Sequence, residues 1–539
     1  MSERFDPFTL EILWSRLIAI VDEAAATLIR TSFSTVVRES YDFSCVLTDR
    51  HGNSLAQASL SIPSFIGTLP RTVKLFLETF PAATLQPGDV LITNDMWLGT
   101  GHLPDINVAK PIFRDGRLVA FAASVAHAPD IGGKMRSPDP REVFEEGLQI
   151  PRMKLHEAGR PNAPLLEILR YNVRVPDQVI GDLDAQLAGL AVMERRLREL
   201  MDEHGLDSVD PLAATIQGLS ERAMRQAIAA LPDGDYDNEL QTDGLAVPVT
   251  LRLKLSVRGD AIHIDFAGTS EQVDRALNVV PSYRDAYTVY PLKCALSPRI
   301  PNNEGAWRPI TIEAPEGSIL NPRYPAAGGS RALVGHYLPP LVFGALAPAI
   351  PDRVMAAAGS PLWCINLAGE SRSGRRFAAM FFVNGGFGAA AGRDGYPCLT
   401  FPSNVSNTPV EIMETTAPIR ILEKRLVPDS GGTGEFRGGL GQVLTVQNLS
   451  ARPVATSFLA ERTRFAAPGL LGGGPGALGG IRIDGQPVDP KTTHIVRPGG
   501  TVELTLPGGG GFGDPARRDP ERIAEDLEAG YVTVRPRGP

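Results

Sequence analysis

Cysteine, histidine and runs of like charge are all scarce in this chain. Its 539 residues include eight histidines and four cysteines, and its formal net charge is −8. The scattered cysteines form no C-x-x-C pair, which argues against a disulfide scaffold or a thiolate zinc site. Because no run of five or more like charges occurs, we expect neither a nucleic-acid partner nor a polybasic membrane contact. The cysteines are Cys45, Cys294, Cys364 and Cys398.

An uninterrupted apolar segment is also missing near the N-terminus. Acidic residues and arginines interrupt the apolar positions of residues 1–30, which argues against a signal peptide and a membrane span. We therefore expect a cytoplasmic enzyme or enzyme subunit.

Glycine and proline, by contrast, are plentiful. The chain has 55 glycines and 46 prolines without a fixed period, which indicates many turns between short elements. We expect an α+β fold, in which an N-terminal mixed α/β region with the candidate site precedes Gly-rich, mainly antiparallel β regions. The proposed divisions are a helix and hairpin region at 1–234, a β-rich region at 235–332, a Gly-rich mixed β region at 333–510 and a helical tail at 511–539.

Local patterns predict several elements within these regions. Asp6 and Pro7 predict the start of a helix that runs to about Arg30. Apolar residues at helical spacing predict a second helix between residues 182 and 204, and a third begins at Asp210. From Tyr236 onward the period changes to two, as in strands. Further along, residues 333–349 look helical only after Pro339 and Pro340, and 514–533 contain a short terminal helix.

Two of the eight histidines lie at opposite ends of the segment 99–133. Asp115 and Gly116 form a strong two-residue turn signal between two apolar runs, which predicts a β-hairpin. With the turn centred there, paired residue numbers sum to 231, so His127 lies opposite Pro104. His102 and His127 then meet on one face at the open end of the hairpin.

Asp105 would face away from these histidines on an uninterrupted strand. Pro104 interrupts the strand, so Asp105 is free to turn towards them. Two imidazoles and a carboxylate form a plausible ligand set for Zn²⁺, Mn²⁺ or Fe²⁺ with positions left for water or substrate. The alternative is that the histidines are hydrogen-bonding residues at the ends of loops and that the acids cap turns. The spacing alone does not decide between these interpretations.

Eight blocks along the chain together resemble the hydantoinase B/5-oxoprolinase family, which also includes a carboxylase subunit acting on acetone. The resemblance covers nearly the whole sequence and keeps the family's order. The blocks are RESYDFSCVLTDRHGN, PGDVLITND, GHLPD, AHAPDIGG, EEGLQIPRMKL, NVRVPDQVIGDLDAQ, LVPDSGGTGEFRGGLGQ and PGGGGFGDP.

The resemblance implies a metal-bearing subunit that works with a separate hydantoinase A-type, ATP-binding subunit. It implies Mn²⁺ or Zn²⁺ held by His102, Asp105 and His127, with Asp42 as a candidate further ligand or base. Phosphorylation by the partner would activate the carbonyl of a cyclic amide, and Asp130 is a candidate general base towards water. Asp130 could equally cap a turn.

The sequence departs from the family pattern at two positions and has no phosphate loop of its own. Ala128 stands where the family often carries a second histidine or a tryptophan, and Met96 replaces the proline of an NDP motif. Both changes leave the substrate in doubt. No G-x-x-x-x-G-K-[ST] motif occurs, and the glycines of 508–513 precede no βαβ unit, so we interpret that loop as structural or as an interface. For 429–441, we expect glycines at positive φ in turns or bulges.

Three functions therefore stay open. The first is an amidohydrolase subunit that opens a cyclic amide in an ATP-dependent hetero-oligomer. The second is a related carboxylase subunit that acts on a ketone. The third is a scaffold subunit that holds the ATP-binding partner without catalysing the reaction.

Overall fold

The computed structural model describes residues 5–134, 136–371, 373–374 and 376–533. Its N-terminal part is built around a seven-stranded antiparallel sheet in the order β2-β1-β5-β4-β3-β6-β7. The strands are β1 (Phe43–Asp49), β2 (Ser54–Gln57), β3 (Val90–Thr93), β4 (Asp105–Arg114), β5 (Arg117–His127), β6 (Met153–Glu157) and β7 (Arg160–Pro161).

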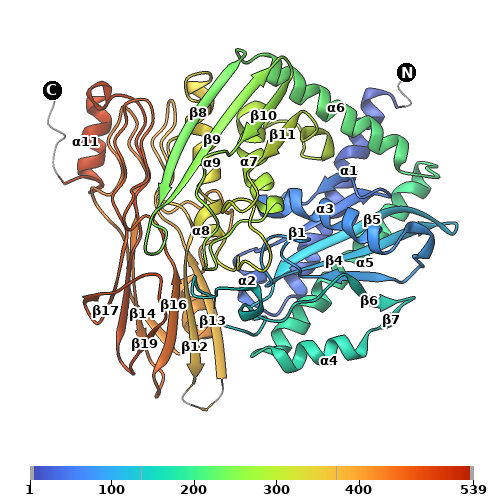
Figure 1. The fold of residues 1–539 in the computed structure, drawn as a ribbon, viewed down its shortest axis with the longest axis horizontal. Helices are drawn as coiled ribbons and strands as arrows, with labels where there is room; N and C mark the ends of the chain where they lie inside the picture. The colour runs from blue at the N-terminus through green and yellow to red at the C-terminus, as the bar shows by residue number, and fades with distance from the viewer. Residues whose placement is uncertain (1–4, 135, 372, 375, 534–539) are drawn as a thin grey trace.

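Helices cover both faces of this sheet. Residues 119–127 of β5 are all buried although successive side chains point to opposite faces. The long helices α1 and α5 pack together, and α5 and α3 both pack on β4 and β5 (Figure 1). The Asp6 side chain accepts hydrogen bonds from the backbone N–H groups at the start of α1, as predicted. The helices are α1 (Pro7–Thr31), α2 (Thr35–Arg38), α3 (Pro63–Thr79), α4 (Ala163–Asn172), α5 (Pro176–Glu203) and α6 (Asp210–Ala229).

The central hairpin forms as predicted, but its register changes by one residue. Arg114 pairs with Arg117 around the expected turn, and the register then shifts because Phe113 pairs with Leu118 and Ile112 with Ala120. Val119 is the extra residue of this β-bulge. The predicted pairing of His127 with Pro104 is therefore wrong, and His127 lies directly opposite Asp105.

A second, four-stranded sheet follows, in the order β11-β10-β9-β8. Alternate residues of β9 are buried, and α9 packs on β8 and β9. The prediction that the helix begins only after the two prolines is wrong, because Pro339 and Pro340 lie in the first turn of α9, where their missing N–H groups cost nothing. The elements are β8 (Gly234–Thr242), β9 (Val249–Arg258), β10 (Ala261–Asp265), β11 (Ile310–Glu313), α7 (Pro281–Leu296), α8 (Ala332–Gly335) and α9 (Leu338–Leu346).

The C-terminal part is a β-sandwich of two further sheets, in the orders β13-β12-β16-β19 and β14-β15-β20-β17-β18. A separate apolar core lies between them and includes Trp363, Phe381, Phe458 and Leu504. The elements are β12 (Trp363–Glu370), β13 (Arg376–Val383), α10 (Val410–Thr416), β14 (Ile419–Leu426), β15 (Gln442–Asn448), β16 (Val454–Leu459), β17 (Gly480–Ile483), β18 (Gln486–Pro487), β19 (His494–Val496), β20 (Thr501–Thr505) and α11 (Pro520–Glu528).

Extended glycine-rich segments pack against one another at one end of the sandwich. We call residues 356–359, 385–389, 430–441, 469–476 and 507–513 the glycine lattice. Its backbones are joined by hydrogen bonds such as Gly510 N to Ala357 O at 2.8 Å and Gly509 N to Gly439 O at 2.9 Å. The expectation of glycines at positive φ within 429–441 is wrong, since Asp429 is the residue there with positive φ. The glycines are needed because a Cβ would collide with neighbouring backbone: at Gly439 it would lie 2.0 Å from Tyr396 O.

These findings confirm the expected α+β class with mainly antiparallel sheets. Among the described residues, no helix combines the length and apolar character that a membrane crossing requires.

Candidate metal centre

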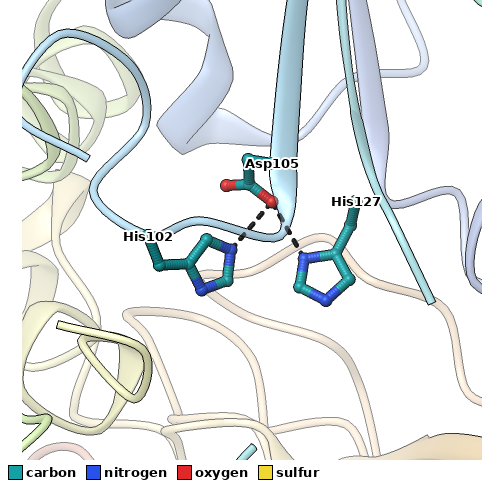
Figure 2. Close-up of side chains that lie close together, drawn as sticks. All are labelled: His102, Asp105 and His127. Carbon is teal, nitrogen blue, oxygen red and sulfur yellow. Dashed lines mark hydrogen bonds and ion pairs between the residues drawn. The ribbon is translucent and has the colours of Figure 1, made fainter. Parts of the chain in front are cut away.

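The candidate site lies at the open end of the β4–β5 hairpin. Asp105 is the first residue of β4 and His127 the last of β5, while His102 comes from the loop that leads into β4. Figure 2 shows the three side chains turned towards one another. All three are almost completely buried, with exposures of 2% or less. The structure thus brings together the three residues that the sequence analysis proposed as metal ligands.

One carboxylate oxygen is shared between the two imidazoles. Asp105 Oδ1 lies 2.8 Å from His102 Nε2 and 2.9 Å from His127 Nδ1. The other ring nitrogen of His102, Nδ1, lies 3.2 Å from the carbonyl oxygen of Gly329. Because a carbonyl only accepts, Nδ1 of the neutral ring carries the hydrogen and Nε2 presents its lone pair to the carboxylate. Two acceptors at 2.8 Å repel each other unless a cation lies beside both.

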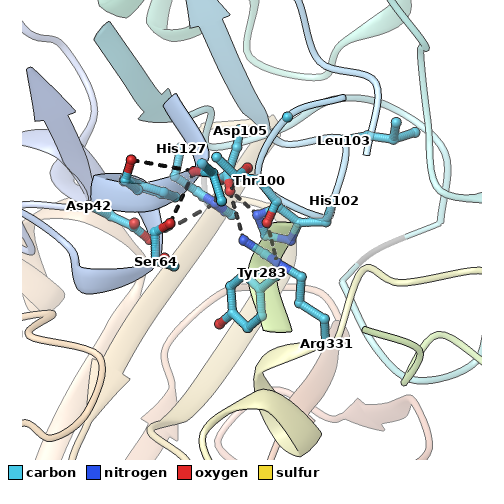
Figure 3. Close-up of polar contacts among 12 residues, drawn as sticks. Asp42, Ser64, Thr100, His102, Leu103, Asp105, His127, Tyr283 and Arg331 are labelled. Atoms are coloured by element: carbon cyan, nitrogen blue, oxygen red, sulfur yellow. Dashed lines mark hydrogen bonds and ion pairs between the residues drawn. The ribbon is translucent and has the colours of Figure 1, made fainter. Parts of the chain in front are cut away.

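The second oxygen of Asp105 is held by residues that the sequence analysis missed. Arg331 Nη2 donates to Asp105 Oδ2 at 2.8 Å, and the hydroxyl of Thr100 donates to the same oxygen. Arg331 Nε also donates to the carbonyl of Thr100 at 2.7 Å. Figure 3 shows Arg331 next to the carboxylate, although Arg331 belongs to a segment that is distant from the hairpin in the sequence. These contacts fix the orientation in which Oδ1 faces the histidines.

The electrostatics of the site favour the protonation states that metal ligands need. Burial lowers the pKa of His102 well below its usual range, and the positive charge of Arg331 acts in the same direction. Burial alone would raise the pKa of Asp105, but its interactions with His102 and the charge of Arg331 outweigh it and hold that pKa well below its usual range. The pair is therefore a neutral imidazole and a carboxylate near neutral pH.

The donor atoms fit a divalent metal. His102, Asp105 and His127 each offer a ligand atom, and these atoms lie within 4.8 Å of one another. Nε2 of His127 is buried and has no hydrogen-bond partner among the described residues, and Nε2 of His102 faces the carboxylate oxygen Asp105 Oδ1 at 2.8 Å. A buried polar atom without a partner is costly, and a bound cation would remove that cost. The set of nitrogen and oxygen donors suits Zn²⁺ or Mn²⁺.

Asp42, the fourth proposed ligand, lies beside this group and outside it. Its carboxylate Oδ2 is 3.9 Å from His127 Nδ1, and its backbone carbonyl accepts a hydrogen bond from His127 N at 3.0 Å. Burial raises the pKa of Asp42, while the charge of His127 opposes the shift. Its role as a ligand or a base stays a prediction.

A pocket of about 730 Å³, open to solvent, leads to the centre. His127 and Ala128 line it, and so do residues of β12 and β13 from the sandwich. The family position occupied by Ala128 therefore contributes to the shape of this pocket. Cys45 does not line it, and burial raises the pKa of its thiol to about 12.

Asp130, the proposed general base, also lines the pocket, and Arg174 binds it. Arg174 Nη1 lies 2.5 Å from Asp130 Oδ1, and the backbone N–H of Arg174 donates to Oδ2. Both carboxylate oxygens are therefore engaged. This contact gives Asp130 a structural role in joining the loop after β5 to the start of α5, and its catalytic role stays a prediction.

Glu146 also lines the pocket. The sequence analysis missed it, although it lies in the EEGLQIPRMKL block. Its side chain is 7% exposed, and Oε1 accepts a hydrogen bond from Gly329 N at 2.5 Å. No local pattern distinguishes it from Glu145, which forms an ion pair with Lys134 on the surface. Arg331 was equally hidden, because it lies 226 residues after Asp105.

The fold and the site together define a mixed α/β protein with a buried His–Asp–His group suited to a divalent metal. Over residues 6–515 the sequence matches the model of the family described as Hydantoinase B/oxoprolinase. The chain therefore belongs to the hydantoinase B/oxoprolinase family, which confirms the resemblance noted from its motifs.

Individual relatives support this assignment. A putative D-/L-hydantoinase subunit from Pseudomonas sp. (strain NS671) is 30% identical, with 98% of this chain and 94% of the relative aligned. The beta subunit of the caprolactamase from Pseudomonas jessenii is also 30% identical, with the same coverage.

Solved structures show the same fold. The crystal structure of ATP-dependent caprolactamase from Pseudomonas jessenii matches with a TM-score of 0.91 at 28% identity, covering 98% of this chain and 95% of that one. A nucleotide-free acetone carboxylase structure matches with a TM-score of 0.87 at 20% identity, covering 98% and 78%. At that lower identity the second match shows the fold alone.

Proposed function

We propose that this chain is the metal-bearing subunit of an ATP-dependent enzyme that hydrolyses a cyclic amide such as a hydantoin, 5-oxoproline or a similar lactam. The convergence of His102, Asp105 and His127, with the buried Nε2 of His127 left without a partner among the described residues, is the observation that carries the proposal. Relatives named as a hydantoinase subunit and a caprolactamase subunit support the substrate class.

The proposal assigns ATP to a hydantoinase A-type partner in a hetero-oligomer. This sequence has no phosphate-loop motif of its own, and both of these relatives are named as subunits. An amide carbonyl is a poor electrophile, and its phosphorylation by the partner would prepare the ring for attack by water. The opened product would then leave through the pocket between the hairpin and the sandwich.

Each residue of the site has a defined part in this proposal. His102, Asp105 and His127 hold the metal, with Asp42 beside them as a further ligand or base. A divalent metal bound there supplies Lewis-acid polarisation of the carbonyl and lowers the pKa of water. Arg331 fixes Asp105, and Gly329 fixes the ring of His102. Asp130 accepts the proton of the attacking water, which requires Arg174 to release one of its oxygens.

The test is to purify the chain with its partner and to measure metal content and ATP-dependent turnover together. We expect bound Mn²⁺ or Zn²⁺ and ring opening of a cyclic amide. His127→Ala should lose both, whereas His51→Ala, at an exposed turn, should keep both. Full turnover by metal-free His127→Ala would reject the proposal. ATP turnover stimulated only by ketones with bicarbonate would favour a carboxylase, and an inert complex would favour a scaffold.

The role of Asp130 needs its own variant. Asp130→Asn keeps the size of the side chain and removes its basicity, so kcat should fall by about 10²-fold or more if Asp130 is the general base. Unchanged kcat would leave Asp130 with its structural role at Arg174.

A further inference from the structure

Glu146 is a buried acid with one unpartnered oxygen. It follows the short helical turn η2 (Val143–Glu145), and its Oε1 accepts from Gly329 N at 2.5 Å. Its Oε2 is buried and has no hydrogen-bond partner among the described residues. A charged carboxylate with a bare oxygen is expensive to bury. The structure therefore suits the neutral acid, with its proton on Oε2.

This acid faces the same pocket as the metal centre. Glu146, His127 and Gly329 all line the pocket. Gly329 also connects the two groups, because its N–H binds Glu146 and its carbonyl oxygen lies 3.2 Å from His102 Nδ1. A ring seated at the metal centre would therefore lie in the pocket that Glu146 also lines.

The charged groups around Glu146 define how it titrates. Burial raises its pKa to about 7, and the N–H groups of Gly329 and Gly328 with the charges of Arg331 and Arg136 oppose this rise. The remaining charged residues of the pocket are largely compensated among themselves, since Lys134 pairs with Glu145 and Arg174 with Asp130. At neutral pH the acid is therefore able both to give up a proton and to take one back.

We propose that Glu146 is a catalytic acid that protonates the ring nitrogen as the amide C–N bond breaks. This inference rests on the proposed function, because it assigns a step of that same reaction. The electron pair of the C–N bond passes to nitrogen, the O–H bond of Glu146 breaks and an N–H bond forms. The water that adds hydroxide to the carbonyl carbon gives its other proton to Asp130, which releases it to solvent, and Glu146 takes a proton back from solvent. One water is consumed in this step, the phosphoryl group stays on the carbonyl oxygen as an acyl phosphate, and a second water then releases it as phosphate.

A structural role for Glu146 predicts different behaviour. If Glu146 only holds the backbone at Gly329, Glu146→Gln should act like the wild type, because glutamine keeps the acceptor for Gly329 N–H. The catalytic role predicts that kcat falls by about 10²- to 10⁴-fold while KM and metal content stay unchanged. Glu142→Gln, an exposed acid in the same segment, is the matched control and should keep full activity.

The pH profile and infrared spectra complete the experiment on the full complex. Wild-type kcat should fall as pH rises through about 7, because the proton donor is lost, and this limb should vanish in Glu146→Gln. In the isolated chain, a carboxylic acid band should titrate in the same range and be missing from Glu146→Gln. Wild-type kcat in Glu146→Gln, or no such band, overturns the inference alone. If the wild-type complex opens no cyclic amide although the carboxylic acid band is present, the proposed function is overturned. The step assigned to Glu146 is then overturned as well.

Discussion

The metal-centre end of the β4–β5 hairpin and the glycine lattice solve opposite packing problems. In the hairpin, the backbone register places chosen side chains at one point, and Asp105 faces His127 because of a bulge at Val119. In the lattice, side chains are absent so that backbones can approach closely, as between Gly386 and Gly439. The end of the hairpin depends on the side chains that are present there, whereas the lattice depends on the absence of side chains.

This difference indicates which kind of substitution should destabilise each region. The hairpin should tolerate changes of side-chain size near its turn, where Arg117 is exposed. It should not tolerate the loss of a charge partner at its other end. The glycine lattice should not tolerate an increase in side-chain size, because even one methyl group would disrupt its backbone hydrogen bonds. The following variants test this contrast.

Removal of the shared carboxylate should have the largest effect. Asp105→Ala leaves Arg331, which is 3% exposed, as a buried charge without its carboxylate. Breaking a buried pair in this way costs about 3–5 kcal/mol of unfolding free energy, and metal binding should be lost as well. Urea unfolding and metal analysis measure the two effects. Asp115→Asn at the exposed turn is the control and should change neither.

A single methyl group in the lattice should come next. In Gly386→Ala, the new Cβ would lie 1.9 Å from Gly439 O, so backbone must shift. We expect a loss of about 3 kcal/mol, at the upper end of overpacking effects, with metal content unchanged. Gly480→Ala, where a Cβ meets nothing within 4 Å, should be nearly neutral. Equal stability of the two variants would contradict the close-packing explanation.

The buried acid of the pocket should make stability depend on pH. The pKa of Glu146 is about 7 in the folded chain against a usual 4.5, so the folded state binds the extra proton between these values. Unfolding free energy should therefore fall as pH rises from 4.5 to 7, by about 1.4 kcal/mol per unit and about 3 kcal/mol in all. Unfolding of the chelator-treated chain at pH 5 and pH 8 measures this change. Glu146→Gln should lose it, and an identical slope would count against the assignment.

The smallest effect should come from the contact between Arg174 and Asp130. The Arg174 side chain is 40% exposed, so solvent screens the pair and Arg174→Gln should cost about 1 kcal/mol or less. If Asp130 acts as a base, its release from Arg174 should alter kcat by less than tenfold. Thermal unfolding and steady-state rates test both. A loss of activity as large as that of Asp130→Asn would instead place Arg174 in the reaction.

Local sequence signals predicted the residues of the site that come from the hairpin, but not those that come from distant segments of the chain. The turn at Asp115 and Gly116 was enough to predict that the segments of His102 and His127 meet, but the parity of the strands was misjudged, because the observed register places Asp105 opposite His127. The bulge at Val119 could not be seen, because no glycine or proline marks it. Arg331 and Gly329 could not be found either, since their contacts with the hairpin depend on tertiary packing over more than two hundred residues.

In the fold, too, local patterns were predicted correctly and contacts between distant segments were not. Periodicity predicted the α+β class and the N-terminal helices, whereas glycine content was attributed to turns when close backbone approach was the cause. Sequence patterns report local conformation, and at these positions the constraint came from a neighbouring segment. The prolines of α9 were misjudged for a local reason, because they interrupt a pattern but fit the first turn of a helix.

The long separation between Asp105 and Arg331 also has a consequence for synthesis. A ribosome that adds about 5–20 residues per second needs roughly 10–45 seconds to extend the chain from one to the other. During the later part of that interval the nascent hairpin is complete, but the guanidinium that encloses its end has not yet been added. Its histidines and carboxylate are then reached by surrounding ions without passing Arg331, so a cation bound at that stage would be enclosed when Arg331 packs against Asp105.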